Sequence, residues 1–453
     1  MSELPNNWAS VKLSDLGTWR GGGTPSKSNP SFWTDGTIPW VSPKDMKKPK
    51  LSSAQDFITE SAVKNSSANL LDEGSLLIVT RSGIPAHSLP IAVNLVSVSV
   101  NQDIKAITPC PATDSEFLWY AFKVFECEIL NTCRKGGTTV HSIEFPSLQA
   151  FEIPLPPLNE QKRIVAKNEE LFSELDAGEA SLRQAKQQLG VYRQSLLKQA
   201  FEGKLTQTWR QQNPDKLESP DHLLARIRET DPTTVEPHEC DNWRTIQFGE
   251  LTEYITSGSR GWAAYYSESG STFIRAQNLK KDYLDLSDIA YVTLPEKAEG
   301  KRTLTQTGDI LITITGANVT KTGYIDRDIG EAYVSQHVAL CRTLDPRLTK
   351  FLYLYIISPS GGRKDLEKAA YGAGKPGLNL TNLRELRVPI CSLAEQREIV
   401  RLLDAQFEVI AQNEGEIDAA LRRSEALRQS ILKKAFSGQL APKPPPTNPP
   451  PNS

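Results

Sequence analysis

The sequence predicts two mixed α/β domains joined by two long antiparallel helices that form a coiled coil, with a pseudo-two-fold internal repeat. Three observations support this fold. A helix-coding stretch at residues 151–205 returns at residues 386–440. Both copies carry apolar residues at a seven-residue spacing, which is typical of helices that pack side by side. The regions before them contain short β-branched runs bounded by Gly, Pro and Ser, which favour strands.

The repeat has a constant offset of 235 residues through the helix-coding stretches. Glu160-Gln161 falls on Glu395-Gln396, and Ala200-Phe201 falls on Ala435-Phe436. The regions before the helices differ in sequence and share only a weak skeleton, such as Val100-Asn-Gln102 and Val334-Ser-Gln336 at an offset of 234. A gene duplication explains this pattern. The contrast suggests a common helical frame and two domains selected for different targets.

We expect domains at residues 1–157 and 241–392. In these domains, strands are expected at residues 76–80, 91–98 and 310–314, and buried helices at residues 117–125 and 351–357.

The long helices are expected at residues 158–205 and 393–440, each about 60 Å long at a rise of about 1.5 Å per residue. Ser392 and Glu395 form a capping-box pattern before the second helix, and Asn159 is the expected cap of the first. Gly203 and Gly438 stand where a left-handed residue ends a helix. The residues expected in the packing seam are Ile164, Leu171, Leu175, Leu182, Leu189, Leu196, Ile399, Leu403, Ile410, Ile417, Leu427 and Ile431.

A lone helix with such a seam would expose an apolar stripe, so the two helices are expected to pack on each other. Antiparallel packing carries the chain to the second domain and back, which brings the two chain ends together. Residues 206–240 form a connector with a short helix beginning at Ser219-Pro220. The proline-rich tail at residues 441–453 is expected to be extended or disordered.

Composition narrows the class of protein. The formal net charge is −2, so any contact with nucleic acid must come from local basic patches or from a partner. Apolar runs are too short to span a bilayer, and the N-terminus lacks the pattern of a signal peptide. The six cysteines show no metal spacing and indicate reduced thiols of a cytoplasmic protein, with a disulfide between Cys127 and Cys133 as the less favoured alternative.

No motif for catalysis or for a metal is evident. The five histidines show no zinc spacing, and His141 and His337 are expected to be ordinary structural residues. Gly372 to Gly377 resembles a phosphate loop, but a proline follows Lys375 where Ser or Thr should bind magnesium. Asn448 and the prolines after it lack the aromatic residue of a methyltransferase motif. We therefore expect no cofactor on this chain.

The doubled helix ending is distinctive. Leu196-Leu197 with Ala200-Phe201, Gly203 and Leu205 is matched by Ile431-Leu432 with Ala435-Phe436, Gly438 and Leu440. Together with residues 153–165 and 388–400, which enter the helices, and with Leu4 to Trp8 and residues 22–25, this pattern resembles the specificity subunit of type I restriction-modification enzymes. The resemblance covers essentially the whole chain.

The resemblance implies a non-catalytic subunit that recognises a bipartite double-stranded DNA target in prokaryotic cytoplasm. It implies two methyltransferase subunits docked on the central helices and optional restriction subunits with translocase activity. S-adenosylmethionine is then expected on the methyltransferase partner, and ATP and magnesium on the nuclease partner. Two unlike domains on a rigid spacer would recognise two unlike half-sites at a fixed separation.

Polar and basic loops are the candidate DNA contacts, because Arg, Lys, Asn, Gln, Ser and Thr side chains reach base edges and phosphates. The alternative for each residue is a solvated surface loop, since charged residues are mostly exposed. The candidates are Arg20, Thr24, Lys27, Lys44, Lys47, Arg81, Ser82, Arg134 and Lys135 in the first domain, and Ser257, Arg260, Trp262, Arg275, Gln277, Asn278, Thr315, Asn318, Lys321 and Lys375 in the second.

Two other functions fit parts of the sequence. A coiled-coil scaffold carrying two protein-binding domains would need the helices but not the basic loops. A single-chain restriction enzyme would need catalytic domains for which 453 residues leave no room.

Overall fold

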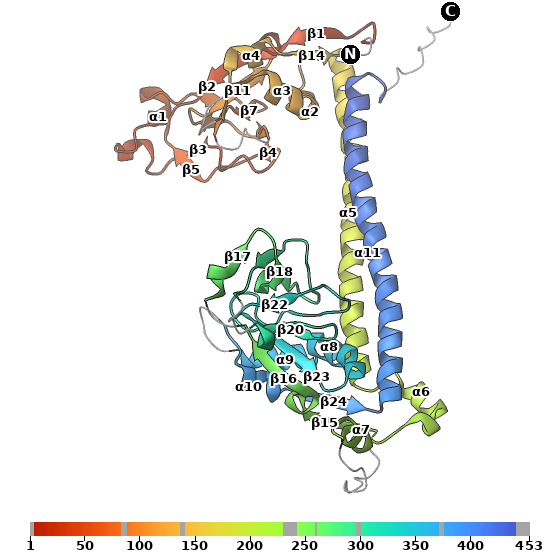
Figure 1. The fold of residues 1–453 in the computed structure, drawn as a ribbon. Helices are drawn as coiled ribbons and strands as arrows, with labels where there is room; N and C mark the ends of the chain where they lie inside the picture. The colour runs from red at the N-terminus through yellow and green to blue at the C-terminus, as the bar shows by residue number, and fades with distance from the viewer. Residues whose placement is uncertain are drawn as a thin grey trace, which may run out of the picture. The chain divides into compact units, whose positions relative to one another are not determined.

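The computed structural model describes residues 4–82, 88–135, 141–229, 242–258, 261–295, 300–370 and 376–440. The chain divides into two compact units. The first contains residues 1–182 and 418–453, and the second contains residues 183–417. Each boundary falls inside a long helix, so each unit holds one α/β domain and one half of both helices (Figure 1).

In the first unit, a five-stranded sheet in the order β2-β11-β7-β9-β4 adjoins a four-stranded sheet in the order β5-β3-β10-β6. A small sheet, β12-β13-β8, and the pair β1-β14 complete the domain. The strands are β1 Ala9–Lys12, β2 Gly17–Gly21, β3 Ile38–Val41, β4 Lys50–Leu51, β5 Asp56–Ile58, β6 Leu70–Leu71, β7 Leu76–Val79, β8 Arg81–Ser82, β9 Ile91–Asn94, β10 Val98–Val100, β11 Ile104–Pro109, β12 Arg134–Lys135, β13 His141–Ile143 and β14 Glu152–Leu155. The helices are α1 Glu60–Asn65, α2 Ser115–Val124, α3 Glu126–Thr132 and α4 Phe145–Ala150.

The second unit repeats this plan with a four-stranded sheet, β16-β23-β20-β21, a second sheet, β17-β19-β18-β22, and the pair β15-β24. The strands are β15 Trp243–Gln247, β16 Thr252–Ser257, β17 Tyr266–Ser267, β18 Ser271–Ile274, β19 Ala290–Val292, β20 Ile310–Thr313, β21 Thr322–Tyr324, β22 Ala332–Val334, β23 Val338–Thr343 and β24 Arg387–Cys391. The helices are α6 Gln207–Gln212, α7 Pro220–Ile227, α8 Thr349–Ile357, α9 Gly362–Ala369 and α10 Leu380–Arg384.

The expected elements are largely present. The runs at 76–80 and 310–314 form β7 and β20, and the aromatic runs form α2 and α8. The run at 91–98 was expected to be one strand and forms two, β9 and β10. The break falls at Leu95 and Val96, which are 43% and 37% exposed, because the chain turns there between two sheets.

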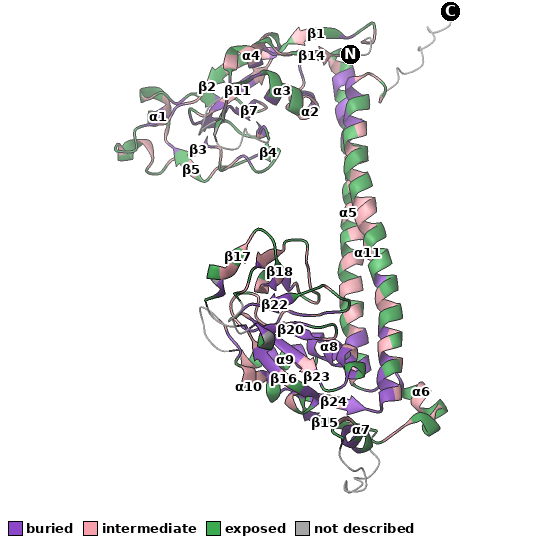
Figure 2. Cartoon of the chain, viewed as in Figure 1, coloured by how far each residue is buried: buried purple, intermediate pink, exposed green. Residues whose placement is uncertain are grey.

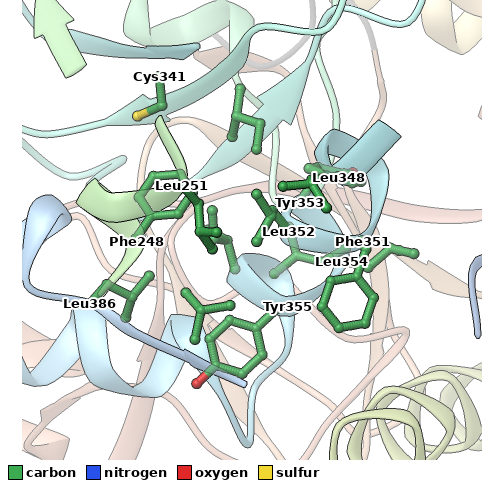
Figure 3. Packing of buried hydrophobic residues seen from close by; sticks show 14 of the residues in the cluster. Phe248, Leu251, Cys341, Leu348, Phe351, Leu352, Tyr353, Leu354, Tyr355 and Leu386 are labelled. Atoms are coloured by element: carbon green, nitrogen blue, oxygen red, sulfur yellow. The ribbon is translucent and has the colours of Figure 1, made fainter. Parts of the chain in front are cut away.

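Aromatic contacts join each α/β domain to the end of a long helix. In the first unit, Phe117 of α2 stacks on Phe436, with ring centroids 4.9 Å apart. In the second, Phe351 of α8 meets Phe201 edge-on at 5.3 Å. Figure 3 shows the packing around α8, where Phe248, Leu251 and Leu386 lie on one side of the helix in the same cluster. The two copies therefore use equivalent rings to fix the helix to the domain.

The long helices are α5, Leu158–Phe201, and α11, Leu393–Phe436, of 44 residues each. Gly203 and Gly438 follow them with φ of +69° and +75°, so the predicted left-handed endings are confirmed. The helices end four residues earlier than the predicted spans of 158–205 and 393–440, because these glycines stop them. Within the described ranges, no helix combines the length and apolar character that a membrane span requires.

The start of each long helix differs from the predicted caps. Ser392 does accept a hydrogen bond from the Glu395 amide at 3.2 Å, but the Glu395 carboxylate turns to Thr206, Arg210 and Trp243 instead of folding back. Only half of the capping box therefore forms. Asn159 lies inside the first turn of α5 and does not cap it, because the helix begins at Leu158.

Buried polar side chains tie each helix to the strand before it. Gln161 donates to the carbonyls of Pro156 and Ala112 at 2.8 and 3.0 Å, and accepts from the Asp114 amide at 2.8 Å. The equivalent Gln396 donates to the Cys391 carbonyl at 2.8 Å. The bonds to Pro156 and Cys391 lie 235 residues apart, so this contact is repeated, whereas Oε1 of Gln396 is buried without a partner among the described residues.

The two long helices pack antiparallel in each unit. In the first unit, Arg428 pairs with Asp176 at 2.6 Å and Ser424 donates to Glu179 at 2.9 Å. Residue numbers rise along one helix as they fall along the other, as antiparallel packing requires. Arg428 also lies 4.8 Å from the centre of the Phe172 ring. In the second unit, Arg193 lies 4.3 Å from the centre of the Phe407 ring, which is the same contact with the helices exchanged.

The predicted seam is buried mainly near the helix ends, as Figure 2 shows for α5 and α11. The fully buried members are Ile164, Leu196, Ile399, Leu403, Ile410 and Ile431. The half-buried members are Leu171, Leu175, Leu182, Leu189 and Ile417. A pair of helices covers only one side of each partner, which explains the partial burial. Leu427 was placed in the seam wrongly: it is 50% exposed, and the neighbouring Arg428 faces the partner helix instead.

The connector contains the predicted helix α7, whose cap is Ser219, and also α6, which was not predicted. Near the chain ends, Pro5 lies against Gly438, where an added Cβ would come within 2.4 Å of the proline ring. This contact confirms that the two ends of the first unit meet. The tail at 441–453 lies outside the described residues.

We expect Gln161→Ala to lower the free energy of unfolding of the first unit by about 1–3 kcal/mol, because the backbone groups of Pro156, Ala112 and Asp114 lose their partner and Pro156 is buried. Thermal unfolding followed by circular dichroism measures the effect. Gln429→Ala, at an exposed position of α11 in the same unit, is the matched control. Equal melting curves for the two variants would contradict the anchoring role.

Candidate nucleic-acid interface

In the second domain, two predicted loops and a third segment meet at the ends of strands. Arg275 to Asn278 follow β18, Thr315 to Lys321 follow β20, and residues 335–337 lie between β22 and β23. The Thr315 hydroxyl hydrogen-bonds Nδ1 of His337, and Asn318 donates to the Ala276 carbonyl at 3.4 Å. Segments far apart in sequence therefore form one polar surface.

Two glycines let these loops pass close to other backbone segments. A Cβ at Gly258 would come within 2.2 Å of the Val334 carbonyl, and a Cβ at Gly22, in the first domain, within 2.1 Å of the Val100 carbonyl. Both glycines allow the chain to cross its own backbone at equivalent places in the two domains.

A cavity of about 320 Å³ opens among the loops of the second domain. Three predicted residues line it: Trp262, Arg275 and Gln277. Ser335, Gln336 and His337 line it too and were not predicted as contacts. The alignment of Val334-Ser-Gln336 with Val100-Asn-Gln102 was the signal that could have found them, because a skeleton shared by divergent domains marks a shared structural position.

Two predicted contacts are corrected. Trp262 is only 6% exposed, because it stacks on Phe273 at 5.6 Å and meets Tyr333 at 5.5 Å. It can form a wall of the cavity but not a free surface contact. Asn278 is 2% exposed, and its amide donates to the carbonyls of Asp285 and Asp288 at 3.0 and 2.8 Å. Asn278 holds its loop together rather than facing a ligand.

Internal partners orient the other polar side chains of this surface. Arg275 donates to the Asp288 carbonyl at 3.1 Å and lies 3.4 Å from the Asp288 carboxylate, and Gln277 donates to that carboxylate at 2.7 Å. Lys321 donates to Asn318 at 2.7 Å. Ser257 is half-buried at the end of β16. These bonds restrict side-chain freedom before any ligand arrives.

In the first domain, the corresponding loop begins at the end of β2. Arg20 is exposed and donates to the Leu70 carbonyl at 3.1 Å. The Thr24 hydroxyl donates to Gln102, which follows β10 just as Gln336 follows β22. Lys27 is exposed on the same loop. In the first domain the loop after β2 thus meets the segment after β10, just as the segment after β16 meets the segment after β22 in the second domain.

The small sheet β12-β13-β8 collects further predicted residues. Arg81 and Lys135 both pair through the backbone with Ser142, from opposite sides of β13. Ser82 and Arg134 belong to the same outer strands, and Arg81 and Arg134 are exposed. Sequence positions more than 50 residues apart are therefore brought to one sheet.

Lys44 and Lys47 lie beyond β3. Lys44 forms an ion pair with Asp56 at 2.9 Å, and this hydrogen bond to a carboxylate raises the pKa of Lys44. The pairing offsets part of the charge that a phosphate would meet. Lys47 is exposed. Arg260 and Lys375, two further predicted contacts, lie outside the described residues, as do most of the loop at Gly372 and the turn at 136–138.

The described ranges hold no cluster of three or more His, Cys, Asp or Glu side chains able to bind a metal ion. Cys127 and Cys133 are both free thiols, so the alternative disulfide does not form.

A family model described as the type I restriction modification DNA specificity domain matches the chain twice, at residues 5–187 and 241–423. Each match begins in one α/β domain and runs into the long helix that follows. Two solved structures share the fold. One comes from work on complex assembly of the type I restriction-modification system, with a TM-score of 0.69, 20% identity, and coverage of 97% of this chain and 100% of that chain. The other is the HsdS subunit from Thermoanaerobacter tengcongensis, with a TM-score of 0.53, 20% identity, and coverage of 96% and 98%.

Sequence relatives have the same description. The EcoR124I/EcoR124II specificity subunit of Escherichia coli is 42% identical over 34% of this chain and 38% of that protein. The EcoBI specificity subunit of the same species is 28% identical over 67% of this chain and 62% of its own length. The chain thus spans less than two thirds of these two relatives. The StySPI specificity subunit of Salmonella potsdam is 25% identical over 97% of this chain and 90% of that protein.

We expect Asn278→Ala to destabilise the second unit by about 1–3 kcal/mol, because the carbonyls of Asp285 and Asp288 and the Arg275 amide lose the buried amide that joins them. Gln277→Ala, at the exposed neighbouring position, should change stability by less than about 0.5 kcal/mol. Chemical denaturation of both variants compares them. If Asn278→Ala proved as stable as Gln277→Ala, the structural role of this amide would be wrong.

Proposed function

Because this chain belongs to the family of type I restriction-modification DNA specificity domains, we propose that it is the DNA-recognition subunit of a type I restriction-modification complex. The observation that carries the proposal is the double family match, once on each α/β domain and its helix. The polar loops gathered at the strand ends of both domains support it. The relatives are described as specificity subunits of type I restriction enzymes, and the proposal applies that description to the whole of this chain.

The two domains recognise the two halves of an asymmetric, bipartite target. Their helices are matched at a constant offset while their loops differ, which suits a common frame carrying different specificities. The long helices set the separation of the half-sites and dock two methyltransferase subunits on their exposed polar faces. Restriction subunits join through those partners.

The chain itself performs no chemistry in this proposal. S-adenosylmethionine is held by the methyltransferase subunit, and ATP and magnesium by a nuclease and translocase subunit. The near-zero net charge also suits a protein that binds DNA fully only together with a partner.

The decisive experiment measures duplex binding and methyl transfer by the purified chain, with and without its methyltransferase subunit. We expect weak binding and no turnover alone, and sequence-specific, salt-dependent binding in the complex. Sequencing modified adenines in host DNA then gives the target. Turnover by the isolated chain would contradict the non-catalytic role, and binding without salt dependence would favour a protein scaffold.

We expect Lys27→Ala to make the plot of log binding constant against log salt concentration less steep by about 1, because one exposed ammonium near the proposed interface would no longer neutralise a phosphate. Filter binding of the complex at several salt concentrations measures this slope. Lys64→Ala is the control, because Lys64 lies on α1 and pairs with Glu60 at 3.4 Å. An unchanged slope for Lys27→Ala would remove this loop from the interface.

Deleting seven residues from each long helix should shorten the gap between the recognised half-sites. Seven residues preserve the seam and remove about 10 Å of helix, which corresponds to about 3 base pairs of DNA. Methylated-site sequencing in cells carrying the variant measures the gap. Alanine substitutions at exposed positions of the same helices are the control and should leave it unchanged. If the number of base pairs between the half-sites stayed the same after the deletion, the spacer role would be refuted.

A further inference from the structure

The cavity in the second domain has the composition of a binding site rather than of a packing defect. Its walls combine the stacked rings of Trp262 and Phe273 with Tyr266, which is 49% exposed at the rim. Gln277 and Gln336 are also exposed there, so the mouth opens to solvent. Flat aromatic walls with polar groups at the edge favour a planar ligand.

Two residues that line this cavity each carry a buried polar atom that has no partner among the described residues. Ser335 is 7% exposed, and its hydroxyl makes no hydrogen bond, although its backbone is fixed by bonds to Ile274, Gly258 and Val338. Nε of Arg275 is likewise buried and unpartnered, while the same guanidinium is held by Asp288. Buried polar atoms normally find partners, so these two indicate a ligand that supplies them.

We propose that this cavity takes up one nucleobase unstacked from the DNA target, held against the aromatic wall and hydrogen-bonded by Ser335 and Arg275. The inference rests on the proposed function, because it takes the ligand to be DNA. The cavity is lined by predicted contacts at Trp262 and in the loop after β18, and by the segment between β22 and β23. Its volume of about 320 Å³ lies in the range of small-molecule sites, roughly 300–1,000 Å³.

An unstacked base explains the mixture of groups better than a base edge within the duplex does. A base in the stack presents only its edge to a groove and would leave the aromatic wall unused. A base turned out of the stack presents both a face for stacking and an edge for hydrogen bonds. The proposed pocket would therefore add specificity at one position of the half-site recognised by the second domain.

The test uses the full chain with its methyltransferase subunit and duplexes of the target found by adenine sequencing. In each duplex one position of the second half-site keeps its base but faces a mismatched partner base. Unpaired bases leave the stack more easily, so a pocket for an unstacked base should bind one such duplex roughly tenfold more tightly.

Two variants assign that gain to the pocket. Tyr266→Ala should abolish it and weaken binding of the paired duplex roughly 5- to 100-fold, because the base loses a stacking partner. Ser335→Ala keeps the wall and removes only the unpartnered hydroxyl, so it should weaken binding about 2- to 10-fold with an unchanged melting temperature. Tyr283→Ala is the control, since Tyr283 is 59% exposed in the same unit and does not line the cavity.

The outcomes separate the two levels of the proposal. If Tyr266→Ala still binds the mismatched duplex more tightly than the paired one, the preference comes from the methyltransferase partner and the pocket assignment is wrong. Equal binding by Tyr266→Ala, Ser335→Ala and Tyr283→Ala would also overturn it. Absence of specific duplex binding by the unaltered complex would instead overturn the proposed function. Free deoxynucleoside monophosphates at the duplex concentration should not compete, and competition by them would assign the cavity to a free nucleotide.

Discussion

The junction between each α/β domain and its long helix is the constraint on which the rest of the structure depends. Gln161 and Gln396 are buried in the first turns of α5 and α11 and donate to the carbonyls of Pro156 and Cys391, just before each helix. Since a buried amide must keep its partners, the helix can leave the domain in only one direction. Because the direction of each helix relative to its domain is fixed, the loops of the domain can differ in sequence without changing how the domain is attached.

The loops can differ because their backbone course is fixed independently of the side chains that face solvent. Gly22 and Gly258 cross the ends of β10 and β22 so closely that any Cβ would clash. Near these crossings, Thr24 hydrogen-bonds Gln102 in the first domain, and Thr315, on the loop after β20, hydrogen-bonds His337 in the second. The backbone crossings are therefore equivalent, while the side-chain contacts near them differ.

The sequence predicted the features that depend on local pattern. The repeat located both long helices, and Gly203 and Gly438 marked their ends. The sequence pattern could not show burial, which depends on tertiary packing: Asn278 has a side chain typical of a DNA contact, yet a loop containing Asp285 and Asp288 buries it. Leu427 fitted the heptad pattern, but Arg428 took the inner position by packing over Phe172. Ser335 lies in the Val334-Ser-Gln336 segment shared by both domains, but that pattern marks a structural position and does not show that the residue lines a cavity.

The exchanged aromatic contacts explain why the helices, unlike the domains, tolerated no insertion. Arg428 packs over Phe172, and Arg193 over Phe407, so each contact takes one residue from each copy of the repeat. Inserting a single residue in one helix would rotate the residues beyond it by about 100° around the helix axis. These residues would then no longer face their partners on the other helix. Insertions in a loop between strands have no such partner to disturb. The constant offset of 235 in the helices, and its change to 234 within the domains, follows from this coupling.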